Sequence, residues 1–482
     1  MSNGNSRATF WAFLITSMGL FITVLDNLVV STALPVIRKD LNAGIDQLEW
    51  TVNAYTLTYA VLLLTGAALG DRFGRRRLFV IGLAIFTGAS ALAALAPDIH
   101  TLIAARAVQG VGGAIVTPLT LTILSAAVKP EKRGVALGAW GAIGGVAVGL
   151  GPVIGGAVVD GISWQWIFWL NVPIGLALLP FAWTKLDETY GRKERLDLPG
   201  LGLVSIGLLG VVWGLVRGNA SGWGSAEILG TIIAGAALLA GFIAWERRTP
   251  EPMLPLRYFR NRTFTAANVA SLLMYFGMFG SIFLLSQFLQ TAQGYSPLSA
   301  GLRVLPWTGM PLIVAPIAGA LSDRIGGRPL MAVGLALQAV GLGWLAAISS
   351  ADMAYSELIA PFAISGIGMG MFFAPVANVV LGSVRPEEEG KASGANNAIR
   401  EIGGVFGVAV LASVFSHKGG YASPDTFVSG LTPAVWVGAG VVAVGAVAAL
   451  WLPSRAKALA EARAHGHVLP GVHTPEPAAE SA

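Results

Sequence analysis

The feature that most constrains this chain is a succession of long apolar segments separated by short polar loops. A helix that crosses a bilayer needs about 20 mostly apolar residues. Only 12% of the 482 residues are charged, against about 25% in ordinary soluble domains. The sequence therefore predicts an all-α integral membrane protein with fourteen spans. Their approximate limits are 11–34, 50–70, 78–97, 101–127, 135–158, 166–184, 198–216, 228–245, 264–289, 300–321, 330–349, 357–384, 396–416 and 433–452.

The ends of the chain and its composition exclude several classes of site. The first apolar segment is longer than the apolar region of a signal peptide, about 7–15 residues, so we expect that it is retained. We expect the polar tail, 453–482, to be disordered and cytoplasmic. Its histidines, His465, His467 and His473, are expected to be solvated, and we expect no metal site. Because the chain has no cysteine, disulfides, thiolate zinc sites and cysteine nucleophiles are excluded.

The distribution of basic residues predicts the orientation. Most of the 31 lysines and arginines lie in the N-terminal segment, in every second loop and in the tail, whereas the opposite loops hold only Arg38, Lys39, Arg217, Arg303 and Lys418. Since positively charged loops remain in the cytoplasm, we expect both termini on the cytoplasmic side of a plasma membrane. The net charge of +5 then reflects membrane topology, and we expect no nucleic-acid partner.

Two stretches of the first half of the chain recur in the second. Gly70-Asp71-Arg72-Phe73-Gly74 returns as Ser322-Asp323-Arg324-Ile325-Gly326, and Gly110 and Gly112 have counterparts in Gly366 and Gly368. Parallel repeats of six-helix bundles are a transporter architecture with the substrate site between the halves. We therefore predict a six-helix bundle over 1–184, a linker with two extra spans over 185–262 and a second six-helix bundle over 263–452.

The repeated loop has a physical logic. Asp71 ends a span, where its carboxylate is able to pair with basic residues of a neighbouring loop or to cap the next helix. Gly74 permits a tight turn, and the run from Arg75 to Arg77 holds the loop at the anionic leaflet. Anchoring by positive charge alone is the simpler alternative. The recurrence of Asp-Arg-x-Gly in the second half argues against it.

Leu69-Gly70-Asp71-Arg72-Phe73-Gly74-Arg75-Arg76 resembles the signature loop of the major facilitator superfamily. Ala67 stands where the family pattern has Gly. The family's motif of the fourth span is similar to Arg106-Ala107-Val108-Gln109-Gly110, and its antiporter motif of the fifth span is similar to Gly151-Pro152-Val153-Ile154-Gly155-Gly156. The first span of the fourteen-span drug:proton antiporters is similar to Leu25-Asp26-Asn27-Leu28. Trp164-Gln165-Trp166 and Asn171-Val172-Pro173 fit that family's sixth span, with Gln165 in place of a usual Arg. The resemblance implies a major facilitator fold and proton-coupled efflux, with the signature loop, Asp323 and Arg324 in gating.

Three polar side chains inside spans are candidates for coupling transport to protons. Arg106 carries an intramembrane charge, which is costly and usually faces a cavity or a partner. Its counterpart in the second half is Phe362, so a purely architectural role does not explain it, although a structural hydrogen-bond anchor remains an alternative. Gln109 lies one turn on, on the same helix face. Asp26 is suited to carry a proton or to recognise a cationic substrate; the alternative is a carboxylate tied to neighbouring backbone.

Two further groups carry weaker signals. The fifth span is rich in glycine and contains Pro152, which suits either a hinge that shapes alternating access or tight helix packing alone. Arg400 and Glu401 open the thirteenth span, and we expect them to pair with loop residues in a structural role.

Aromatic, amide and Met side chains in spans two, nine, ten and twelve are candidates to line a pocket for lipophilic ligands, although each is individually explained by helix packing. They are Tyr55, Tyr59, Tyr275, Phe279, Gln287, Trp307, Met369, Phe372, Phe373 and Asn378.

Transport driven by an ion gradient fits these observations best. The chain has no phosphate-binding Gly-x4-Gly-Lys-Ser/Thr loop, so ATP does not drive it directly, and we expect no cofactor. The leading hypothesis is proton-coupled efflux of lipophilic, often cationic drugs or antibiotics by a monomeric, bacterial antiporter. An exporter or symporter of an endogenous metabolite, and a membrane-embedded enzyme, are the alternatives. An enzyme would need interfacial acids or histidines, and the spans contain no histidine cluster.

Overall fold

The computed structural model of the chain describes residues 3–129, 133–191, 196–385 and 388–457. The side chains of residues 3–6, 133–135 and 323 are outside this description, as is most of the tail with its three histidines. The described residues form helices and loops, without a strand.

Among the described residues, fourteen helical spans are long and apolar enough to cross a membrane, as predicted. The first bundle contains α1 (Asn3–Asp40), α2 (Ile45–Phe73), α3 (Arg75–Ala94), α4 (Ile99–Ala127), α5 (Arg133–Gly161), α6 (Trp166–Trp169) and α7 (Asn171–Lys185). The two inserted helices are α8 (Leu198–Ser221) and α9 (Ala226–Glu246), followed by the short 3-10 helix η2 (Leu256–Arg260). The second bundle contains α10 (Arg262–Thr291), α11 (Pro297–Thr308), α12 (Met310–Ile325), α13 (Gly327–Ile348), α14 (Tyr355–Leu381), α15 (Glu389–Lys418) and α16 (Pro424–Ala449).

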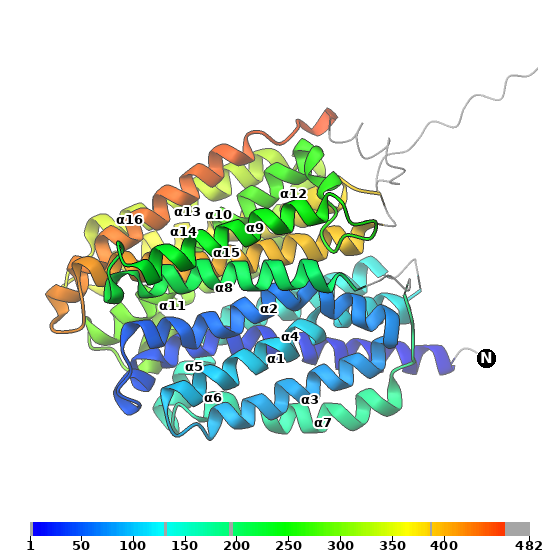
Figure 1. The fold of residues 1–482 in the computed structure, drawn as a ribbon, viewed down its shortest axis with the longest axis horizontal. Helices are drawn as coiled ribbons and strands as arrows, with labels where there is room; N and C mark the ends of the chain where they lie inside the picture. Colours follow the sequence, from blue (N-terminus) through cyan, green and yellow to red (C-terminus); the bar gives the residue numbers. More distant parts are fainter. Residues whose placement is uncertain (1–2, 130–132, 192–195, 386–387, 458–482) are drawn as a thin grey trace, which may run out of the picture.

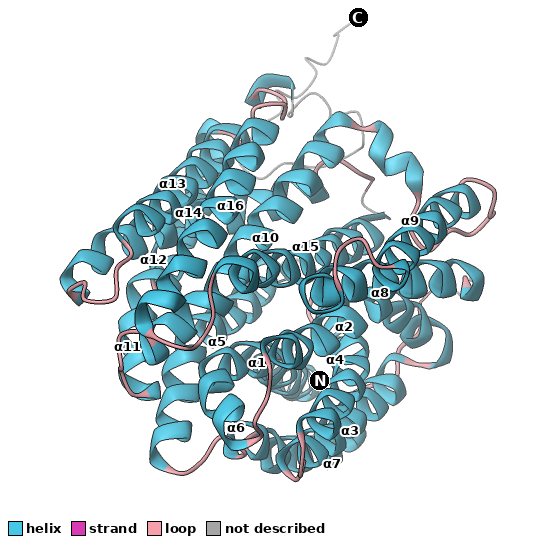
Figure 2. Ribbon diagram, turned by 60° about the vertical axis from the view of Figure 1, so that its left-hand side comes forward, coloured by secondary structure: helices cyan, strands magenta, loops and turns pink. Residues whose placement is uncertain are grey.

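The helices form two bundles with the inserted pair at one side. Figure 2 shows α1–α7 in the lower part and most of α10–α16 above them, with α8 beside α2 and α15 and α9 on the outer side of α8. The halves meet where α2 packs on α15 and where α5 packs on α11. Asn219 of α8 donates to the Ser413 carbonyl of α15 and thereby fixes the inserted pair to the second bundle. The predicted fold, two six-helix bundles with two extra central helices, is confirmed.

Two predicted spans are interrupted, and several helices extend beyond their predicted limits. The sixth span breaks between α6 and α7, and the tenth breaks at Gly309, between two prolines, Pro306 and Pro311. Proline removes a helical donor and disturbs the preceding turn, which hydropathy does not detect. The last helix begins at Pro424 rather than 433 because the Ser423 side chain accepts from the backbone N–H of Thr426 and caps a polar first turn.

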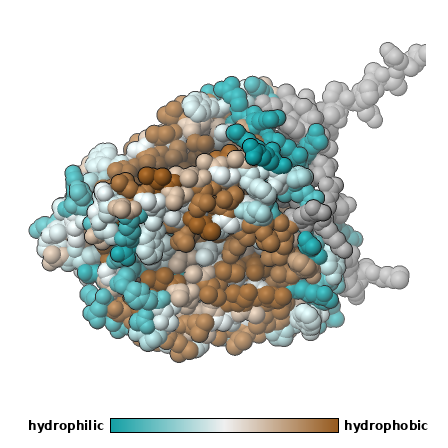
Figure 3. Space-filling view, viewed as in Figure 1, coloured by the Kyte–Doolittle hydropathy of each residue, from teal (hydrophilic) through white to brown (hydrophobic). Residues whose placement is uncertain are grey.

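The surface agrees with a membrane setting. A broad apolar band lies between two polar ends (Figure 3). The start of α1 and the end of α16 lie at the same end of the molecule (Figure 1). We call this the basic end, because it carries the junction of α2 and α3, where Arg75, Arg76 and Arg77 form the first turn of α3. The opposite end, which carries the loops after α1, α10 and α15, is called the far end.

Glycines let α4 pack closely between α2 and α3. A Cβ at Gly112 would lie 2.5 Å from the backbone nitrogen of Phe86 in α3, and one at Gly110 would lie 2.5 Å from the carbonyl oxygen of Tyr55 in α2. Only a residue without a side chain permits such approach. Arg106 and Gln109, on the same helix, are therefore held inside the first bundle.

Candidate functional site

The centre of the candidate site is an ion pair buried inside the first bundle. Arg106 of α4 donates through Nη1 to Oδ2 of Asp26, which lies on α1. Both side chains have no exposed surface. Burial removes the water that would otherwise stabilise each charge, so each ion depends on the other for compensation. The two charges most clearly singled out by the sequence are thus direct partners.

Amide and hydroxyl groups complete the network around Asp26. Gln109 Nε2 donates to Asp26 Oδ1 at 2.7 Å, and its Oε1 accepts from Arg106 Nη1 at 2.7 Å. Asn171 Nδ2, from α7, donates to the same Asp26 oxygen at 2.8 Å. Gln109 also donates to the Ser90 hydroxyl of α3 at 2.8 Å. Four helices therefore supply side chains to one closed network, and the predicted alternative of a carboxylate tied to backbone is wrong.

Arg106 makes further contacts with α2. Its Nε donates to the Thr51 carbonyl at 3.2 Å, and its guanidinium carbon lies 4.3 Å from the centre of the Tyr55 ring. Nη2 is buried without a partner among the described residues. A cation over an aromatic face is stabilised by the ring quadrupole. Arg106 therefore links the carboxylate on α1 to an aromatic residue on α2.

The network brings Asp26, Arg106 and Gln109 together as an interacting set, and it adds Asn171 and Ser90, which the sequence did not single out for this role. Asn171 is 1% exposed and Ser90 is fully buried. For both residues, the signal available in the sequence was a polar side chain within an apolar span. Chemically, the Asp26 carboxylate is able to exchange its arginine partner for a proton, since a protonated carboxyl no longer compensates the guanidinium.

A second group of candidates forms an aromatic cluster between the bundles. Tyr55 and Tyr59 of α2 stack at 5.8 Å between ring centres. Tyr275 of α10 contacts Phe279 at 5.6 Å and Phe373 of α14 at 6.1 Å. Tyr59, Tyr275, Phe279 and Phe373 are each only partly buried, so their rings retain accessible surface. Aromatic faces of this kind suit flat lipophilic or cationic ligands.

Two charged residues of α15 border this aromatic cluster. The Arg400 guanidinium lies 5.0 Å from the centre of the Tyr275 ring and 5.6 Å from that of Phe373, and its Nη1 donates to Asn397 at 3.2 Å. Glu401 interacts electrostatically with Tyr59 and Tyr275. The expectation that Arg400 and Glu401 pair with loop residues is therefore wrong, because their side-chain neighbours lie within the spans.

The remaining predicted lining residues are dispersed. Trp307 stacks on Phe362 at 5.9 Å inside the second bundle, and Gln287 accepts from the Tyr421 hydroxyl near the far end. Met369 and Phe372 are buried, whereas Asn378 is exposed. Helix packing accounts for the buried side chains among them, so residue type alone predicted too many lining residues.

The signature loop is held by interactions within the first bundle and the linker. Arg75 pairs with Asp71 at 2.8 Å, which places the Asp71 partner on the next helix rather than on another loop. Gly74 has φ 109°, a conformation that favours glycine. Glu188 of the linker accepts from the backbone N–H of Arg76 at 2.9 Å. Arg72 and Arg324 are exposed, and the side chain of Asp323 is outside the description.

The glycines of α5 lie at the far end, where the two halves meet. A Cβ at Gly155 would lie 3.0 Å from the Val29 backbone of α1, and one at Gly156 would lie 2.7 Å from Cα of Leu298 in α11. Gly151 faces Leu28 of α1, and Pro152 faces Gly301 of α11. This is the tight packing expected of small residues. In this conformation the far end is closed along α5.

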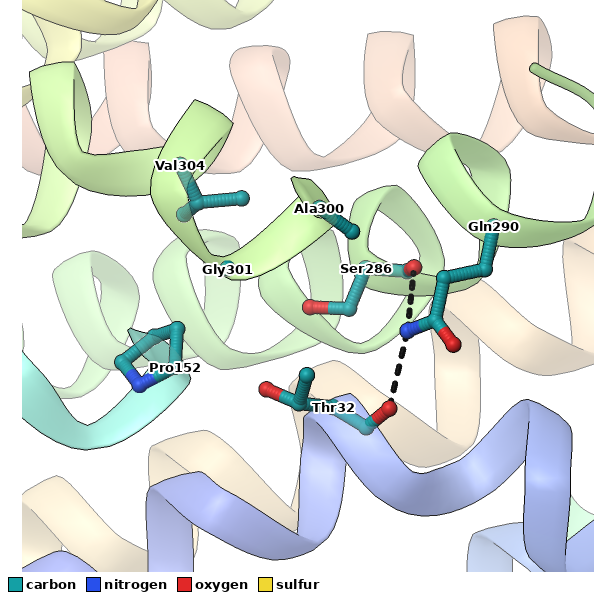
Figure 4. A pocket seen from close by; sticks show the side chains of 7 residues that line it. All are labelled: Thr32, Pro152, Ser286, Gln290, Ala300, Gly301 and Val304. Atoms are coloured by element: carbon teal, nitrogen blue, oxygen red, sulfur yellow. Dashed lines mark hydrogen bonds between the residues drawn. The ribbon is translucent and has the colours of Figure 1, made fainter. Parts of the chain in front are cut away.

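A small pocket beside these glycines shows the same closure. It is lined by Thr32, Pro152, Ser286, Gln290, Ala300, Gly301 and Val304 (Figure 4). Gln290 Nε2, on α10, donates to the Thr32 carbonyl of α1 at 2.8 Å. A hydrogen bond therefore joins the two bundles across this pocket.

Comparisons with known proteins agree on one family. The model of the Major Facilitator Superfamily matches residues 16–305 and 267–477. The tetracenomycin C resistance and export protein of Streptomyces glaucescens is 33% identical over 433 residues, 89% of this chain and 80% of that protein. The multidrug resistance protein Stp of Mycobacterium tuberculosis is 35% identical over 413 residues, 85% of this chain and 76% of its own. The inward-open xylose transporter XylE from E. coli has a similar fold, with TM-score 0.63 and 15% identity over 95% of this chain and 99% of that one.

Proposed function

Because the chain belongs to the major facilitator superfamily, a family of transporters rather than enzymes, we propose that it exports lipophilic, often cationic drugs or antibiotics in exchange for protons. The observation that carries the coupling mechanism is the fully buried Asp26–Arg106 pair. The naming of its relatives as resistance and export proteins supports the choice of substrate class.

Proton coupling follows from competition for one carboxylate. When Asp26 is ionised, Arg106 is held on it together with Gln109 and Asn171. A proton on Asp26 removes the charge that compensates Arg106, and the guanidinium must find another partner. The Tyr55 ring already lies against it and belongs to the aromatic cluster. Protonation of Asp26 thus reaches the substrate pathway through Arg106 and Tyr55.

The aromatic cluster between the bundles is the proposed substrate contact. Tyr59, Tyr275 and Phe373 offer ring faces, and Glu401 places a carboxylate beside them. A ring face and a carboxylate both favour an organic cation, whereas the rings alone bind a neutral lipophilic compound. This arrangement accounts for export of both classes. It assigns the Asp26 network to protons rather than to direct contact with the substrate.

The proposed setting is the plasma membrane of a bacterium, with the basic end in the cytoplasm and the protein a monomer. The positive loop between α2 and α3 and its counterpart after α12 support this orientation. The far end, which is closed here, then faces the outside. The closed far end corresponds to the half of the transport cycle in which the substrate enters from the cytoplasmic side.

The experiment that tests the function is efflux of a cationic dye and of a neutral drug in a pump-deficient bacterium, with and without an uncoupler. We expect both to be exported by the wild type and retained when the uncoupler is present. Asp26→Asn should abolish uncoupler-sensitive export of both, whereas Glu401→Gln should reduce export of the cation alone. Asp352→Asn, which removes an exposed carboxylate, is the control and should behave like the wild type. Full, uncoupler-sensitive export by Asp26→Asn would refute the coupling role.

A further inference from the structure

A second carboxylate is buried close to the far end. Glu49, one turn into α2, has only 1% of its surface exposed, and its Oε2 has no hydrogen-bond partner among the described residues. One turn further along α2, Asn53 is fully buried with both its side-chain oxygen and nitrogen unpartnered. The sequence analysis did not single out either residue.

The charges around Glu49 do not compensate it. Its charged neighbour on the same helix is Asp46, which is also negative. From the second bundle, Tyr421 of the loop between α15 and α16 interacts electrostatically with Glu49. Burial raises the pKa of Tyr421, which therefore stays neutral and donates a hydrogen bond from its hydroxyl to Gln287 Oε1 of α10 at 2.5 Å. Among the described residues, an ionised Glu49 would have no cationic partner.

A cation of α1 is engaged with the same tyrosine. The guanidinium carbon of Arg38, from α1, lies 3.8 Å from the centre of the Tyr421 ring, and its Nε is unpartnered. No ion pair joins Arg38 to Glu49 in the described structure. Tyr421 of the second bundle thus lies against Arg38 of the first bundle and interacts electrostatically with Glu49.

Other contacts close the far end along with Tyr421. Gln290 joins α10 to α1 at Thr32, and Asp160 of α5 accepts from the backbone N–H of Leu298 in α11 at 3.2 Å. Glu49 lies near the start of α2, which packs on α15 of the second bundle, and Tyr421 interacts with it from the same bundle, so separation of the halves removes part of the cover over this carboxylate. When the halves separate, Glu49 becomes hydrated.

Burying an unpartnered ionised carboxylate costs much free energy, whereas burying a neutral carboxyl costs far less. We propose that Glu49 is a second proton-binding site, which takes a proton from the outside and thereby permits the far end to close. The step is simple: hydronium gives its proton to the Glu49 carboxylate, which becomes a neutral carboxyl and leaves water. This inference rests on the proposed function for its orientation. It adds a gate that ties the return of the empty transporter to external protons.

The test measures opening of the far end rather than transport. Because the chain lacks cysteine, a single Ser286→Cys substitution in the full chain places one thiol in the pocket between the bundles. Its labelling by a membrane-impermeant maleimide from outside reports opening. Gly224→Cys, in the exposed loop after α8, reports the intrinsic pH dependence of the thiol reaction. The ratio of the two rates is followed as external pH is lowered at fixed internal pH.

In the otherwise unchanged chain, the ratio should fall as the external pH is lowered, by up to about tenfold per pH unit while Glu49 titrates. Glu49→Gln is permanently neutral, so its ratio should stay low at every pH. Glu49→Asp should keep the pH dependence, and so should Asp46→Asn, the matched control on the same turn. If Glu49→Gln follows the same pH profile as the unchanged chain, another group closes the far end and the inference is overturned. That result would leave the efflux test of Asp26 unaffected.

Discussion

The Asp26–Arg106 pair leads to a prediction in which the two single substitutions are not equivalent. Asp26→Asn removes the carboxylate and leaves Arg106 inside the bundle, with no exposed surface and no compensating charge. Arg106→Gln leaves the Asp26 carboxylate, which is still held by Gln109 and Asn171. A carboxylate is able to take up a proton, whereas a guanidinium stays charged. Asp26→Asn should therefore be the more damaging of the two.

The magnitude follows from the contacts. Removing one partner of a buried pair costs about 3–5 kcal/mol, mostly because the other charge is left uncompensated. Asp26→Asn should lose an amount within this range at every pH. Arg106→Gln should lose less, because Gln109 and Asn171 still donate hydrogen bonds to the Asp26 carboxylate. The double variant, which combines Asp26→Asn with Arg106→Gln, has no buried charge at this site and should regain most of the lost stability.

The assay is thermal unfolding of the purified protein in detergent across a pH series, with dye efflux measured in parallel. The double variant should fold nearly as well as the wild type yet fail to couple efflux to protons. This separates a structural role from a coupling role, since a structural pair would be replaceable by neutral residues. Uncoupler-sensitive efflux in the double variant would refute coupling through the pair, and wild-type stability in Asp26→Asn would refute the electrostatic argument.

Two further predictions concern the far end. Gly156→Val should lower the free energy of unfolding by about 1–3 kcal/mol and open the far end, because a side chain there overlaps α11. Faster labelling of the Ser286→Cys thiol would show the opening. Gly161→Ala, whose added Cβ meets nothing within 4 Å, is the control. Asp98 accepts from the backbone N–H groups of Thr101 and His100 at the start of α4, and the Thr101 hydrogen bond leads in lowering its pKa. The stabilisation by ionised Asp98 is present at pH values above the ordinary pKa of an aspartate, about 3.9, and is lost as the pH falls through the lowered pKa. Asp98→Ala should therefore reduce the melting temperature at pH 7, and its melting temperature should converge with that of the wild type in strong acid.

The fold was largely predictable because a bilayer restricts the chain to few solutions. Apolar length alone indicated fourteen spans, and the repeat of Asp71-Arg72 as Asp323-Arg324 divided them into two halves. The breaks at Leu170 and Gly309 were missed, since hydropathy averages over residues that interrupt a helix. The helix ends were also placed too far inside, because polar first turns capped by residues such as Ser423 lie outside the apolar window.

The candidate site was predictable in part. Asp26, Arg106 and Gln109 were found because charge and amide groups are costly in an apolar span. That they form one network depends on how α1 and α4 pack, which the sequence does not specify. Asn171 and Glu49 were missed for opposite reasons. Asn171 was read only as part of a family segment, whereas Glu49 lies so near the start of its helix that an exposed position was the simplest assumption.

The two halves share their packing but not their chemistry. Gly112 meets Gly82 across α3 and α4, and Gly368 meets Gly334 in the same way across α13 and α14. One turn before these glycines, the first half places Gln109 in the Asp26 network, whereas the second half has Ser365, whose hydroxyl is buried without a partner among the described residues. Packing is thus repeated because both bundles must bring helices equally close. A buried ion pair has no such architectural necessity, and among the described residues it occurs in the first half alone, which agrees with the proposed role of Asp26 and Arg106 in proton coupling.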